Sequence, residues 1–70
     1  MAKRTTGTVR WYDGSKGYGY IDAEDGADVF VHYRDLSTGE TPVLMAGEEV
    51  AFFLEHTFRG PQATDVTRLN

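Results

Sequence analysis

The side chains in this sequence that could do chemistry are mostly flat rings. Four aromatic residues and a histidine fall in one stretch, KGYGYIDAEDGADVFVHY, between Lys16 and Tyr33. Unpaired bases stack on such rings for about 1 to 3 kcal/mol per base, while Lys and Arg hold the phosphates. Because Arg10, Lys16 and Arg59 are the cations available beside the rings, the pattern predicts a surface for single-stranded nucleic acid.

Catalytic and metal-binding patterns are missing from the sequence. The chain has no cysteine, which excludes disulfides, thiolate zinc sites and cysteine nucleophiles. Its two histidines, His32 and His56, have no carboxylates that the spacing brings to them. The GYG segment lacks the rest of a phosphate-binding loop, and DAEDGAD lacks the last acid of a calcium loop. We therefore expect a protein that is not an enzyme and uses no cofactor and no metal.

The net charge of −4 argues against a nucleic-acid partner, but the charges are unevenly distributed. Residues 1–20 carry four cations and one acid, whereas residues 21–55 carry one cation and nine acids. The positive part thus coincides with the start of the ring-rich stretch. The longest apolar run is VAFFL, residues 50–54, so neither a signal peptide nor a membrane span is expected, and the cytoplasm is the default location.

Five short strands are needed to position these side chains. Alternating and β-branched residues predict strands at about 5–13, 17–23, 28–33, 48–57 and 62–69. Gly-rich turns separate most of them, and a loop at 34–47 has one helical turn at RDL. The 70 residues form one domain with an ordered core at about 5–69, and the fold class is all-β, a small five-stranded antiparallel barrel.

Alternation assigns the rings to the outer face of the barrel. Ile21, Val29 and Val31 are β-branched core candidates, as are alternate residues of the fourth strand. The opposite face then carries Tyr18, Tyr20, Phe30 and His32. One alternative is that these rings only stabilise the sheet through cross-strand pairs, at roughly 0.2 to 1 kcal/mol each. A contiguous apolar patch on a small domain favours a binding surface instead.

Alternation does not settle three other rings. It places Trp11 on the face of Val9 and so predicts a buried indole, unless a bulge or the bend at Asp13 turns the ring outward. It also predicts that Tyr33 points inward, and it leaves Tyr12 ambiguous.

The segments GTVRWYDGSKGYGYI, DVFVHY and GPQATDV resemble, in order and spacing, the bacterial cold shock proteins. KGYGYI looks like the first ribonucleoprotein motif of that family and VFVHY like the second, and the resemblance covers about residues 6–67. It implies a Greek-key barrel of the oligonucleotide-binding class (OB-fold). It also implies an RNA chaperone that binds single-stranded RNA and DNA with low selectivity and a preference for pyrimidines, and that takes part in the cold shock response or in regulating transcription or translation.

The resemblance also implies roles for individual residues. It corrects alternation by placing two further rings on a base-stacking platform, which then comprises Trp11, Tyr18, Tyr20, Phe30, His32 and Tyr33. Lys16 and Arg59 lie near this platform, and Arg10, Tyr12 and Asp28 match positions near the ligand groove.

The sequence departs from the family at several positions. Tyrosine stands at residues 12, 18, 20 and 33, where phenylalanine is commoner, and Thr41 replaces an aromatic ring of many members. Phe58 could supply that missing ring, although a loop phenylalanine usually packs against the barrel. Phe53 on the outer face is either a partly covered surface residue or a dimer contact, and we expect a monomer. The rival function is a protein-interaction barrel whose aromatic face binds a proline-rich or extended peptide.

Overall fold

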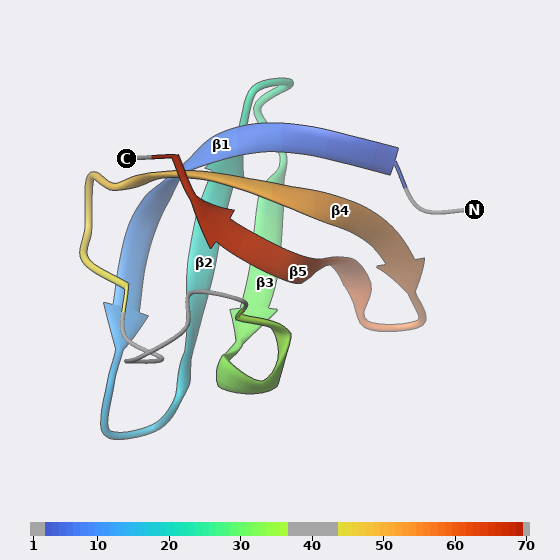
Figure 1. Cartoon of the computed structure of the whole chain (residues 1–70). Coiled ribbons are helices and arrows are strands. Elements are labelled where there is room, and N and C mark those ends of the chain that lie inside the picture. Colours follow the sequence, from blue (N-terminus) through green and yellow to red (C-terminus); the bar gives the residue numbers. More distant parts are fainter. Residues whose placement is uncertain (1–2, 37–43, 70) are drawn as a thin grey trace.

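The structure is a computed structural model that describes residues 3–36 and 44–69. It contains five strands and one short 3-10 helix, in the order β1 Lys3–Asp13, β2 Tyr18–Ala23, β3 Asp28–His32, η1 Tyr33–Asp35, β4 Glu49–Thr57 and β5 Gly60–Arg68 (Figure 1). All five predicted strands are confirmed, and the helical turn expected at RDL begins one residue earlier. The remainder of the predicted loop lies partly outside the described residues, and Thr41 lies entirely outside them.

The strands close into a barrel in the order β1-β2-β3-β5-β4, which confirms the predicted fold class. Long β1 makes the closure possible, because its first half pairs with β4 and its second half with β2, as Figure 1 shows. Four of the five pairings are antiparallel, and the seam between β3 and β5 is parallel, with Phe30 opposite Gln62. Closure pairs the strand edges with each other.

The core consists of buried apolar side chains from all five strands and from the segment before β4: Val9, Ile21, Ala23, Val29, Val31, Leu44, Val50, Phe52, Ala63 and Val66. Each large member contributes roughly 1.5 to 3 kcal/mol of hydrophobic stabilisation. The inward assignment of Ile21, Val29 and Val31 is confirmed, since all three are fully buried. Their neighbours along β2 and β3 must therefore point outward.

A bulge in β1 decides the position of Trp11. Val9 pairs with Ile21, but Trp11 pairs with Tyr20, so Arg10 is an extra residue in β1. The extra residue shifts the alternation and turns Trp11 outward with Tyr20, leaving the residue 41% exposed. The burial that simple alternation predicts for Trp11 is therefore wrong. Gly19 makes room for the bulge, because a Cβ there would lie 2.2 Å from the carbonyl oxygen of Trp11.

Alternation also predicts the wrong position for Tyr33, but for a different reason. Strand β3 ends at His32, and Tyr33 begins the 3-10 helix, so the two-residue period no longer applies to it. Its ring lies against Gly17, where an added Cβ would come within 2.6 Å of Cδ2 of Tyr33. The backbone N–H of Tyr33 donates to the Gly17 carbonyl at 2.9 Å. Tyr33 is 44% exposed, and the inward position predicted by alternation is wrong.

Candidate nucleic-acid interface

Six rings form one surface on β1, β2, β3 and the start of η1, which we call the aromatic platform: Trp11, Tyr18, Tyr20, Phe30, His32 and Tyr33. The register produces it, because Tyr20 pairs with Trp11 on one side and with Phe30 on the other. Tyr18 pairs with His32 in the same way. The outward rings of three adjacent strands therefore lie side by side across the sheet.

The rings of the aromatic platform are close neighbours. The centroid of Trp11 lies 5.9 Å from that of Tyr18 and 5.6 Å from that of Tyr20. The centroid of Phe30 lies 5.8 Å from that of Tyr18 and 5.6 Å from that of Tyr20, which closes a ring of four contacts. These are favourable aromatic distances, so the pairs also stabilise the sheet. None of the four rings is buried, however, and their outer faces remain available to bases.

His32 and Tyr33 form the end of the platform near η1. Their ring centroids are 4.5 Å apart. Nδ1 of His32 accepts the backbone N–H of Arg34 at 3.3 Å, so the neutral ring carries its proton on Nε2. This bond caps the 3-10 helix and fixes the orientation of the imidazole.

An open groove of about 520 Å³ continues from the platform toward the β4–β5 hairpin. One set of lining residues belongs to β2, β3 and η1, and the other to the hairpin and β5; together they are Tyr20, Phe30, His32, Arg34, Thr57, Arg59, Gly60, Pro61 and Gln62. Gln62 is fixed in place, because its Nε2 donates to Oδ2 of Asp35 at 3.2 Å. The groove therefore combines stacking surfaces with two arginines.

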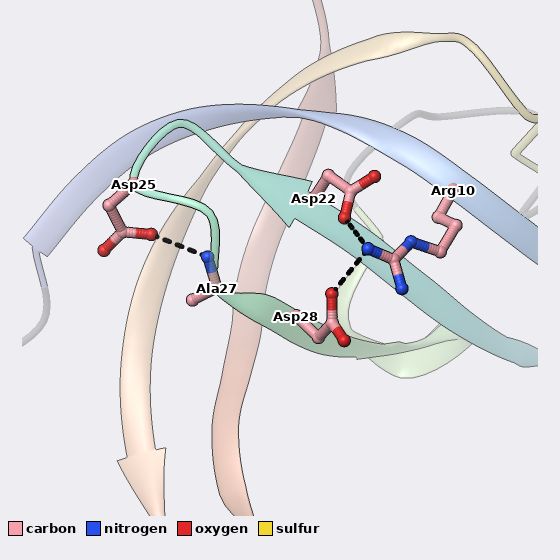
Figure 2. Close-up of polar contacts among 5 residues, drawn as sticks. All are labelled: Arg10, Asp22, Asp25, Ala27 and Asp28. Atoms are coloured by element: carbon pink, nitrogen blue, oxygen red, sulfur yellow. Dashed lines mark hydrogen bonds and ion pairs between the residues drawn. The ribbon is translucent and has the colours of Figure 1, made fainter.

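Arg10 was predicted to be one of the cations near the ligand, but it is engaged by acids. Its guanidinium forms ion pairs with Asp22 and Asp28, the latter at 2.8 Å, and Figure 2 shows it between the two carboxylates. The pKa of Arg10 is raised above its ordinary value, first by the hydrogen bond to Asp22 and then by the two negative charges. With two acids to one cation, this edge of the platform, beside the β2–β3 turn, carries a net charge of about −1.

Lys16 is exposed in the turn between β1 and β2, close to the start of the platform. Asp13 shapes that turn, since its Oδ1 accepts hydrogen bonds from the hydroxyl of Ser15 at 2.7 Å and from the backbone N–H of Lys16 at 3.2 Å. These bonds favour the carboxylate and lower the pKa of Asp13, the Ser15 hydroxyl most strongly. The side chain of Lys16 has no ion pair among residues 3–36 and 44–69.

Phe58 and Arg59 lie at the tip of the β4–β5 hairpin. Phe58 is 94% exposed, so the packing against the barrel that is usual for a loop phenylalanine does not occur. The Arg59 guanidinium carbon lies 5.5 Å from the centre of the Phe58 ring, a cation–π distance. Arg59 also lines the groove, opposite the platform.

Tyr12 is not one of the six rings of the aromatic platform. It is half-buried and packs against the core, because it follows the bulge and pairs with Gly19 on the inner side of the sheet. Burial raises the pKa of its hydroxyl, and the Tyr33 hydroxyl adds to the shift. The structure thus groups six predicted rings, places Lys16 in the turn before β2 and Arg59 in the groove, and packs Tyr12 against the core.

Sequence reasoning missed part of the groove. Arg34 stands directly after VFVHY, and Gln62 follows GP in the last turn, yet neither was among the predicted contacts. The position of Arg34 beside His32 was the available signal. No such signal pointed to Gln62, because the parallel β3–β5 pairing that brings it opposite Phe30 joins residues 32 positions apart.

Two further findings concern the described part of the chain. Within residues 3–36 and 44–69, no group of three or more His, Cys, Asp or Glu side chains could hold a metal ion. Across the same residues, no helix is long and apolar enough to span a bilayer.

Comparison with known proteins gives matches over nearly the whole chain. Residues 5–69 match the family model described as "'Cold-shock' DNA-binding domain". The "Major cold shock protein" of Streptococcus pyogenes serotype M18 is 44% identical over 63 residues, which is 90% of this chain and 94% of that protein. "Cold shock protein 1" of Lactiplantibacillus plantarum is 48% identical over 60 residues, covering 86% of this chain and 91% of the relative.

Solved structures support the fold alone. The structure of "drosophila Unr CSD456" superposes with a TM-score of 0.80 at 23% identity over 97% of this chain, which spans 27% of that larger protein. A Cu(II)-containing CusF variant from Escherichia coli superposes with a TM-score of 0.65 at 14% identity, over 99% of this chain and 92% of its own. At these identities the likeness concerns the barrel and carries no function.

Proposed function

This chain belongs to the "Cold-shock" DNA-binding domain family, and from that premise we propose that it binds single-stranded RNA and DNA by base stacking. The observation that carries the proposal is the continuous ring network of the aromatic platform, in which Trp11, Tyr18, Tyr20 and Phe30 are mutual neighbours on the outside of the barrel. A surface of adjacent rings accepts any base, because every base has a flat face. We therefore expect the protein to bind single strands with low sequence selectivity.

The proposed contacts extend beyond the network. His32 and Tyr33 add stacking surface at one end, and Phe58 adds a further ring at the hairpin tip. Lys16 and Arg59 supply cations for the phosphates. Three further residues are proposed to lie near the bound strand, because they match positions near the ligand groove of the family: Arg10, Tyr12 and Asp28.

The proposed activity is that of an RNA chaperone that uses no ATP. Bases inside a hairpin cannot offer their faces to the platform, whereas an open strand can. Binding therefore shifts the population toward the unpaired strand, to the extent that stacking on protein replaces stacking on neighbouring bases. Such a protein is a binder and not an enzyme, and in our proposal it acts as a monomer in the cytoplasm.

We further propose a preference for pyrimidine-rich strands. Runs of pyrimidines stack weakly on one another and keep the backbone flexible, so they lose less on transfer to the protein. In the cell this activity would serve the cold shock response or the regulation of transcription or translation.

Trp11 provides the test, because it is the only tryptophan and lies within the platform. Short oligo-dT and oligo-U strands should quench its fluorescence, and a blunt duplex of the same length should quench far less. A folded protein whose emission no single strand changes at low salt would refute the proposal. Quenching by a proline-rich peptide alone would assign the platform to peptide recognition instead.

A further inference from the structure

Two arginines face the groove beside the platform. Arg34 belongs to η1, directly after β3, and Arg59 belongs to the β4–β5 turn, yet both line the same groove with Phe30 and His32. The parallel β3–β5 seam brings the two segments together. Cations therefore approach the groove from two different elements.

The charges of these arginines are available to a ligand. No ion pair joins the guanidinium of Arg34 or Arg59 to a carboxylate within the described parts of the chain. Asp35, the acid nearest to Arg34 in sequence, accepts a hydrogen bond from Gln62 instead. Arg34 is itself exposed, and its backbone N–H, rather than its side chain, is bound to His32.

The opposite edge of the platform has the reverse character. Arg10 is shared between Asp22 and Asp28, so a phosphate that approaches this edge meets a net negative charge. Like charges at close range oppose binding, even when each exposed ion pair is weak. A phosphate is therefore repelled where Asp22 and Asp28 flank the β2–β3 turn and attracted at the groove.

We propose that Arg34, together with Arg59, binds the phosphodiester backbone of a single strand whose bases stack on the platform. The inference rests on the proposed function and adds to it a path: the strand leaves the platform through the groove, toward the β4–β5 hairpin. The planar guanidinium suits this role, because its fork of N–H donors can bind two oxygens of one phosphate. Arg34 sets the position of the backbone, and the rings hold the bases.

The test is the salt dependence of oligo-dT binding, followed by Trp11 fluorescence. For single strands, each phosphate contact contributes about −0.7 to the slope of log K against log salt. Arg34→Gln should reduce the slope by about that amount and weaken binding to all sequences alike. Arg34→Lys, which keeps the charge, should retain the slope. Arg4→Gln is the matched control, because it makes the same change in net charge at a residue that lies over Phe53, 5.7 Å from its ring centre.

The outcomes separate this inference from the proposed function. If Arg34→Gln and Arg4→Gln change the slope equally, the effect is one of net charge and the inference is overturned. If the wild-type protein binds oligo-dT and Arg34→Gln binds with an unchanged slope, only the inference fails. If the wild-type protein binds no single strand, the proposed function fails and the inference with it. Thermal unfolding of each variant confirms that the barrel remains folded.

Discussion

Phe30 occupies the middle of the platform, with Tyr18 and Tyr20 as neighbours in β2 and the groove on its other side. Val31 follows it directly and is fully buried. Two consecutive residues of β3 thus belong to different environments, one to the proposed ligand surface and one to the core. This contrast separates binding from stability at the scale of single residues.

Phe30→Ala should weaken oligo-dT binding by about 1 to 3 kcal/mol, the stacking energy of one base, with a small loss of stability. Val31→Ala should instead lower the free energy of unfolding by about 2 kcal/mol, through lost burial and a new cavity, and bind normally while folded. Fluorescence titration and urea unfolding measure the two effects. The assignment of faces would be contradicted if Phe30→Ala mainly destabilised the fold and left the affinity intact.

Asp22 offers a gain-of-affinity prediction. Asp22→Asn removes one of the two carboxylates around Arg10, so the local charge rises from about −1 to about zero. Oligo-dT should bind several-fold more tightly, with a steeper salt slope. Glu49→Gln, an equal charge change at an exposed position of β4, is the control. Equal effects of the two substitutions would show that only net charge matters and that the ion pair around Arg10 has no special role.

At the scale of elements, the β1–β2 turn should respond to acid. The folded-state pKa of Asp13 is lowered by the Ser15 hydroxyl and the Lys16 N–H, so the folded protein binds fewer protons than the unfolded chain. The stabilisation is present above the unfolded pKa, about 3.9, and is lost as the pH falls through the folded value. Urea midpoints at pH 7 and pH 3 should therefore differ less in Asp13→Asn than in the wild-type protein. Equal differences would contradict this role of the turn.

The strands were predictable because turns and alternation are local signals. In β2 and β3 no bulge interrupts the period, so Ile21 and Val29 were correctly assigned to the core and Tyr20 to the surface. Trp11 was not predictable by alternation, because the bulge at Arg10 depends on the register between β1 and β2, which the period within β1 does not reveal. The resemblance to the cold shock proteins placed the Trp11 ring outward, but it did not identify the bulge as the cause.

The charges of the candidate site were harder to predict than its rings. The ion pairs of Arg10 join residues 12 and 18 positions apart, and sequence gives no register from which to infer them. The exposure of Phe58 depends on the hairpin tip, where no other segment among residues 3–36 and 44–69 covers the ring. Ring positions follow from the period within a strand, whereas charge pairing follows from how the strands are assembled.

At the scale of the whole molecule, a net charge of −4 limits the electrostatic part of binding. If Lys16, Arg34 and Arg59 each make one phosphate contact, the slope of log K against log salt should be about −2.1 for oligo-dT. Stacking then supplies most of the affinity. A slope several times steeper, measured by fluorescence titration across salt concentrations, would contradict this division.

The most direct measurement of the central claim is an NMR titration of the protein with oligo-dT, followed through the ring protons. Bases that stack on the platform should shift the ring signals of Trp11, Phe30 and His32, because each lies under the ring current of a neighbouring base. Phe53, on β4 beneath Arg4, should keep its shifts and serves as the internal control. Shifts confined to Phe53 and its surroundings, with the platform signals unchanged under saturating oligo-dT, would contradict the account.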